Sequence, residues 1–82
     1  MELIDGAYLW HLKATHGLPL DMAIMKCAQH DRIPTWLDLL RAARRDGANI
    51  DVLIRELQFC VREAYPQPVA DEVNHKLGWF EG

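Results

Sequence analysis

The chain has 82 residues, of which 50% are hydrophobic and 26% are charged, a composition typical of a folded domain and not of a disordered segment. A chain of this length supplies one hydrophobic core and is too short for two. Twelve acidic residues outnumber nine basic ones, and the resulting net charge of −3 disfavours general attraction to nucleic acid or to an anionic membrane.

The sequence shows no sign of a membrane segment or a secretion signal. No apolar stretch approaches the roughly 20 residues that cross a bilayer, and the first five residues lack the basic start of a signal peptide. The two cysteines, Cys27 and Cys60, lie within apolar helical patterns, where reduced core thiols are common. We therefore expect a cytoplasmic protein without membrane association.

Apolar residues recur at steps of three and four along almost the whole chain, and no long run alternates with the period of two that strands require. The pattern predicts an all-α fold without a β-sheet, a single helical domain over residues 1–82 in an orthogonal or irregular bundle. We expect about five short helices, over residues 3–15, 19–30, 35–45, 49–64 and 69–77, followed by a tail over residues 78–82.

The first two helices are defined by an apolar stripe and by the residues between them. Ile4, Tyr8 and Leu12 would form the buried stripe of the first helix. Gly17 suits the left-handed conformation that ends a helix, and Pro19 suits the first turn of the next one.

The later helices have recognisable capping residues. Thr35 and Asp38 have the spacing of a capping box, and Asn49 is a suitable cap for the fourth helix. Pro66 and Pro68 would end that helix, because proline lacks the N–H and the backbone freedom that a continuing helix needs.

A spacing of 30 residues relates two parts of the chain. The pattern of glycine, aspartate and isoleucine at Gly17, Asp21 and Ile24 returns at Gly47, Asp51 and Ile54. Two interpretations remain open: two helical hairpins in tandem followed by a fifth helix, or two helix connections that obey the same capping rules independently.

The sequence lacks the residues of several common catalytic centres. It contains no serine, and its glycines are isolated from one another, so a serine nucleophile and a phosphate-binding loop are excluded. Five carboxylates lie in first helical turns, where the helix dipole accounts for them; they are Asp21, Asp38, Asp51, Asp71 and Glu72. We expect no cofactor and no enzymatic activity.

Cysteine and histidine residues offer one alternative to this interpretation. Cys27 and His30 stand three residues apart, and Cys60 and His75 could join them as a nucleophilic pair or as a Cys₂His₂ zinc site. Structural zinc sites mostly contain two local ligand pairs, and only Cys27 and His30 form one. We therefore expect no metal and no reactive thiol.

The densest basic cluster is Arg41, Arg44 and Arg45, which share one face of the third predicted helix. Gly47 and another predicted helix follow this cluster, an arrangement that resembles a helix-turn-helix in outline. The alternative hypothesis is therefore a small DNA-binding regulator that uses the arginine face. The acidic residues of the following helix and the negative net charge oppose this hypothesis.

Three tryptophans are many for this length. Trp36 is expected in the core, whereas Trp10 and the adjacent pair Trp79 and Phe80 are candidate anchors for a protein interface, because large aromatic side chains bury much area at little entropic cost. The leading prediction is a non-enzymatic protein-binding module, such as a bacterial or phage accessory regulator or inhibitor of a host protein. A second copy of the chain is one candidate partner.

Overall fold

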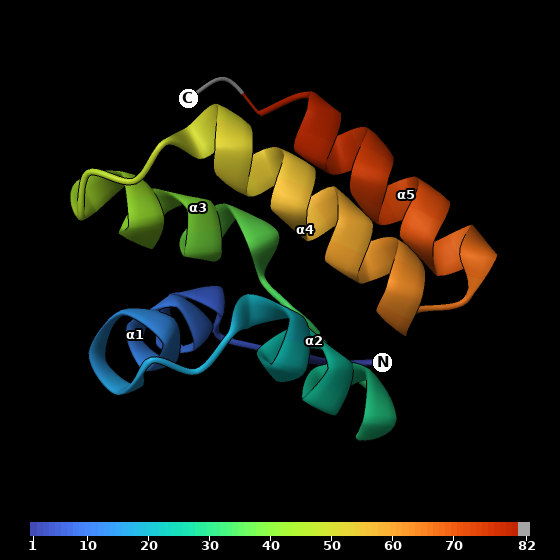
Figure 1. Cartoon of the computed structure of the whole chain (residues 1–82). Helices are drawn as coiled ribbons and strands as arrows, with labels where there is room; N and C mark the ends of the chain where they lie inside the picture. Colours follow the sequence, from blue (N-terminus) through green and yellow to red (C-terminus); the bar gives the residue numbers. More distant parts are fainter. Residues whose placement is uncertain (81–82) are drawn as a thin grey trace.

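Five helices and two short strands make up the described part of the chain. The computed structural model describes residues 1–80, and positions 81 and 82 of the predicted tail lie outside it. The order is β1 (Glu2–Ile4), α1 (Gly6–His16), α2 (Leu20–Gln29), β2 (Arg32–Pro34), α3 (Trp36–Arg45), α4 (Ile50–Ala64) and α5 (Gln67–Gly78). In Figure 1, α4 and α5 lie side by side on one side of the molecule, α1 and α2 lie on the other, and α3 lies between them. The predominantly helical fold class is confirmed.

The prediction that the chain contains no sheet is wrong. β1 and β2 pair in parallel, with Leu3 opposite Ile33, and the pairing continues where the Thr35 N–H donates to the Ile4 carbonyl at 2.9 Å. Strands of three residues are too short to show a period of two, and their pairing is visible only in the folded chain. The first helix therefore begins at Gly6, where the Asp5 side chain accepts from the Ala7 N–H at 3.0 Å.

The buried face of α1 also differs from the predicted stripe. Tyr8 is exposed, whereas Leu9 and Trp10 are buried. Gly6 lies so close to α3 that a Cβ atom there would overlap the Thr35 carbonyl oxygen and lie 2.8 Å from the Leu39 nitrogen. Because α1 packs on α3 through its glycine end, the face that it buries is rotated away from the expected one.

The predicted ends of several helices are confirmed. Gly17 and Gly47 have φ of 68° and 82°, the left-handed conformation that glycine adopts without strain. The Asn49 side chain accepts from the Val52 N–H at 3.2 Å. α5, however, begins at Gln67 and not at residue 69, since Pro68 lies in the first turn, where a missing N–H costs nothing.

Thr35 does not form the predicted capping box. Its hydroxyl accepts from the Gly6 N–H at 2.9 Å and donates to the Asp38 carboxylate at 2.7 Å, and it makes no capping bond to its own helix. The hydroxyl instead joins the start of α1 to the start of α3, a contact between residues that are 29 positions apart.

The spacing of 30 residues coincides with a repeated order of elements in the structure. The unit β1–α1–α2 is followed by the unit β2–α3–α4, and the strand register pairs Glu2 with Arg32, which is 30 positions later in the sequence. Each element packs on its counterpart: β1 on β2, α1 on α3 and α2 on α4. Stacked units of this kind bury a common core, because neither unit can cover its apolar face alone. α5 follows the second unit and packs on α4.

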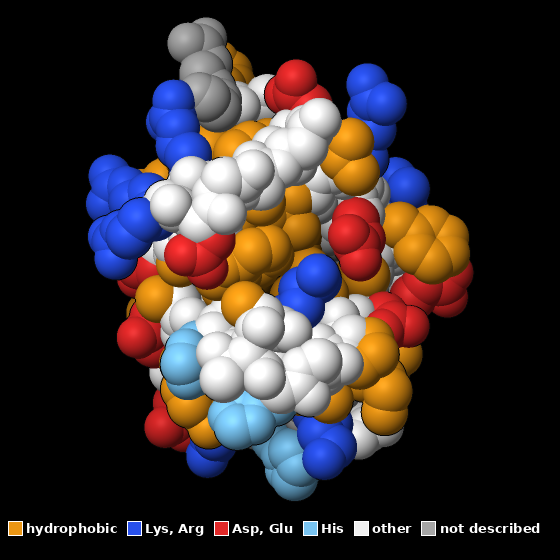
Figure 2. Space-filling view, turned by 60° about the vertical axis from the view of Figure 1, so that its left-hand side comes forward, with side chains coloured by type: hydrophobic (Ala, Val, Ile, Leu, Met, Phe, Trp, Pro, Cys, Tyr) orange, Lys and Arg blue, Asp and Glu red, His pale blue; other side chains and the backbone are white. Residues whose placement is uncertain are grey.

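One cluster of buried side chains receives contributions from all five helices of the described chain. Its largest fully buried side chains are those of Leu20, Ile24, Leu39, Leu40, Leu57, Val61 and Leu77. None of the helices in residues 1–80 combines the length with the apolar character that a bilayer-spanning segment requires. Figure 2 shows one face of the surface, on which basic side chains stand in separate groups with acidic ones between them.

Candidate functional site

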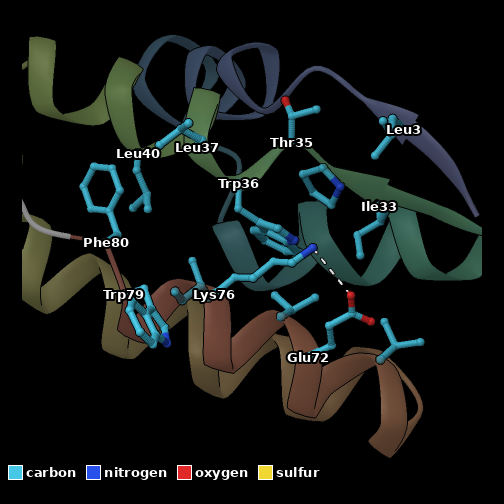
Figure 3. A pocket seen from close by; sticks show the side chains of 14 residues that line it. Leu3, Ile33, Thr35, Trp36, Leu37, Leu40, Glu72, Lys76, Trp79 and Phe80 are labelled. Atoms are coloured by element: carbon cyan, nitrogen blue, oxygen red, sulfur yellow. Dashed lines mark ion pairs between the residues drawn. The ribbon is translucent and has the colours of Figure 1, made fainter.

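An open apolar groove separates α5 from β2 and the start of α3. Its volume is about 570 Å³, and Figure 3 shows side chains from the sheet, α3 and α5 directed into it. We name it the tryptophan groove; it is lined by Leu3, Ile33, Pro34, Thr35, Trp36, Leu37, Leu40, Val69, Glu72, Val73, Lys76, Leu77, Trp79 and Phe80. It is the largest of the surface hollows described for residues 1–80.

The fold brings three separate segments to this groove. Leu3 and Ile33 are direct partners in the sheet, so their side chains share one of its faces. Trp36 and Leu37, in the first turn of α3, begin one residue after the end of β2. α5 packs on α4 with one side and presents Val73 and other residues to the groove. The groove therefore depends on the pairing of β1 with β2, which the sequence did not reveal.

Two of the predicted anchor residues meet in this groove. Trp79 is 75% exposed, and its indole N–H donates to Nε2 of His75 at 3.1 Å. That bond requires His75 Nε2 to be unprotonated. Phe80 is half-buried, packs against the core and lines the groove beside Trp79. Figure 3 shows both side chains at the end of the groove near Leu37 and Leu40.

The groove also contains a few polar groups. Glu72 and Lys76 form an exposed ion pair at 3.5 Å on α5, drawn as the dashed line in Figure 3. The indole N–H of Trp36 is buried and has no hydrogen-bond partner within residues 1–80. Buried donors are nearly always paired, so the wall of the groove contains a polar group that the described chain leaves unsatisfied.

Trp10 is not an exposed anchor, and this part of the prediction is wrong. It retains 9% exposure, its indole N–H donates to the Asp46 carboxylate at 2.7 Å, and the Lys13 ammonium lies 5.3 Å from the ring centre. The ring packs in the core between the two units. The prediction assumed that α1 buries the face that contains Tyr8, and Trp10 lies on a different face of that helix. The bond to Asp46 spans 36 residues and left no local signal.

The arginine cluster is exposed on α3, as its spacing predicts. Arg41, Arg44 and Arg45 all lie on the surface of the last two turns of that helix. The helix that follows, α4, packs against α2 on one side and α5 on another. A recognition helix needs one exposed side that can enter a DNA groove. Because α4 has a neighbouring helix on two sides, its placement differs from that of a recognition helix.

The cysteines and histidines are not gathered into a reactive centre. Burial raises the pKa of the Cys27 thiol, with a smaller opposing effect from Arg32, and burial followed by nearby carboxylates raises the pKa of Cys60. Cys27 and His30 line one small pocket of about 150 Å³. Within residues 1–80, no group of three or more potential ligands is placed to hold a metal ion.

Comparisons with known proteins do not indicate a function for the chain. No family model matches the chain, and neither a curated protein nor a solved structure matches it.

Proposed function

We propose that the chain is a non-enzymatic protein-binding module and that the tryptophan groove receives apolar side chains of its partner. The observation that carries the proposal is Trp79, which is 75% exposed at the end of an apolar groove of about 570 Å³. Exposed aromatic residues beside a hydrophobic pocket are the usual energetic centres of protein interfaces.

The backbone next to the groove favours a polypeptide ligand. The Glu2 N–H donates to Asp31, and the Ile4 carbonyl accepts from Thr35. In a parallel ladder the bonding direction alternates along the strand, so the N–H and carbonyl of Leu3 are directed away from β2. Within residues 1–80 no strand pairs with this outer edge of β1, so a partner segment in the groove would add main-chain hydrogen bonds to its apolar contacts, a mode of recognition specific to peptides.

The groove supports binding better than it supports catalysis. Within residues 1–80 its lining contains one exposed ion pair and neither cysteine nor histidine, and His75 reaches it through the bond that it accepts from Trp79. A regulator or an inhibitor that acts by occupying a partner relies on shape complementarity, apolar contact and hydrogen bonds at the rim, and it needs no catalytic group.

The test is capture of a partner by tagged protein from a lysate of the source organism, with half of each sample treated with nuclease. We expect one protein to be recovered at constant stoichiometry after nuclease treatment, and Trp79→Ser to reduce its recovery at least tenfold. Val52→Ser, an exposed apolar residue of α4 outside the groove, is the matched control and should leave recovery unchanged.

Two outcomes would overturn the proposal. Equal recovery with Trp79→Ser and the unaltered protein would show that the groove is not the interface. Loss of all captured protein on nuclease treatment would instead favour the nucleic-acid alternative and would direct attention to Arg41, Arg44 and Arg45.

A further inference from the structure

A second apolar surface lies between α2 and α4, apart from the tryptophan groove. Met22, Met25 and Phe59 are all exposed there, with 52%, 37% and 58% of their surfaces accessible. They line a groove of about 430 Å³, which we name the methionine groove, together with Asp21, Lys26, Gln29, Cys60 and Glu63. The two grooves have no lining residue in common.

Acidic side chains border this groove. Asp21 and Glu63 line it, whereas Lys26 is the only cationic residue that does so within the described chain. Glu56 lies one turn before Cys60 on α4, and its carboxylate, with that of Asp21, adds to burial in raising the pKa of Cys60. Within residues 1–80, Glu56 and Glu63 form no ion pair.

The basic residues of α4 are directed away from this groove. On a helix with 100° per residue, Glu56 and Glu63 lie on the α2 side of Phe59, and Arg55 and Arg62 lie on the opposite side. The exposed surface of α4 is therefore negative on the side that faces α2 and positive on the opposite side.

We propose that the methionine groove binds a cationic amphipathic helix of a protein partner. Both walls of the groove are helices, whose backbone groups are already paired, so an extended strand would find no main-chain partners there, whereas a helix requires none. Methionine side chains adapt to the shape of an apolar helix face. Lysine or arginine residues beside that face would meet Asp21, Glu56 and Glu63, and an anionic segment would be repelled.

The test measures fluorescence anisotropy of two synthetic 14-residue helical peptides, one of leucine and lysine and one of leucine and glutamate with the same pattern. We expect the cationic peptide to bind at least tenfold more tightly than the anionic one. Phe59→Ser should weaken it at least tenfold, and Glu56→Gln/Glu63→Gln should weaken it about fivefold and reduce its dependence on salt.

Matched variants separate this site from general attraction to an acidic protein. Glu2→Gln/Asp71→Asn removes the same charge from β1 and α5, outside the groove, and should change the affinity less than twofold. Trp79→Ser should also leave it unchanged, because Trp79 belongs to the other groove.

Three results would overturn the proposal. The first is equal binding of both peptides, and the second is an equal loss of affinity in the two charge-removing variants. The third is a dimer in sedimentation equilibrium that Phe59→Ser dissociates, since the occupant would then be a second copy of the chain.

Discussion

The two sides of α3 show how one helix can be closely packed on one side and bounded by an open groove on the other. α1 packs against it through Gly6, where a Cβ atom would overlap the Thr35 carbonyl. On its other side, Trp36, Leu37 and Leu40 line the tryptophan groove, because α5 packs on α4 and stands apart. The first contact stabilises the fold, whereas the second surface stays open to solvent.

The largest expected effect is at the closely packed contact. Gly6→Ala should destabilise the fold by about 3 kcal/mol or more, because the new methyl group meets backbone atoms that cannot move aside as a flexible side chain does. Urea unfolding measures this change. Gly78→Ala, a helical glycine with open space around its Cβ position, should differ by less than about 1 kcal/mol; equal losses in both variants would contradict the close approach of α1 and α3.

A second prediction compares two tryptophans. Trp10→Phe should cost about 2 kcal/mol, because it removes the 2.7 Å bond to the Asp46 carboxylate and leaves space in the core. Trp79→Phe should change the stability by less than about 0.5 kcal/mol, since its ring is mostly exposed. Thermal unfolding of both variants checks this, and similar melting temperatures would contradict the assignment of Trp10 to the core.

Thr35 provides a smaller effect at the junction of the two units. Thr35→Val should cost between about 1 and 2 kcal/mol, because the Gly6 N–H loses its acceptor and Asp38 loses a donor. Thr35→Ser retains the hydroxyl and should recover most of that loss in the same urea titration. A serine variant as unstable as the valine variant would show that the hydroxyl bonds contribute little.

The smallest expected effect concerns Tyr65, at the end of α4. Its hydroxyl donates to the Arg32 carbonyl at 2.7 Å, so Tyr65→Phe should cost about 1 kcal/mol. Burial raises the pKa of Tyr65 well above its usual range, with a smaller effect from Cys27. The folded state therefore favours the neutral phenol, and this contribution is present below about pH 10 and is lost as the pH rises further.

The control for this prediction is Tyr8→Phe, which alters an exposed tyrosine of α1. Urea unfolding at pH 9 and pH 11 should show a steeper alkaline loss of stability for the unaltered protein than for Tyr65→Phe. An identical loss in both would show that Tyr65 does not ionise on unfolding in this range.

The sequence predicted the helices well because their determinants are local. Gly17, Gly47 and Asn49 act within one helical turn of their own positions. The strand pair joins residues 30 positions apart and the Trp10–Asp46 bond joins residues 36 apart, and a three-residue strand has too little pattern to reveal its partner.

The candidate site was predictable only in part. The adjacency of Trp79 and Phe80 after a helix end indicated an aromatic surface, and both residues line the tryptophan groove. Leu3 and Trp36 were missed as groove residues because their position depends on the sheet. The 30-residue spacing was the available signal, since it places residue 3 opposite residue 33.

The most direct test of the account is ¹⁹F NMR of protein that carries 5-fluorotryptophan at Trp10, Trp36 and Trp79, recorded before and after addition of the captured partner. Trp→Phe variants assign the three signals. We predict that the signals of Trp36 and Trp79 shift on binding and that the signal of Trp10 does not, because Trp10 is held in the core by Asp46. A shift confined to Trp10, or no shift at the two groove tryptophans, would contradict the assignment of the tryptophan groove as the binding site.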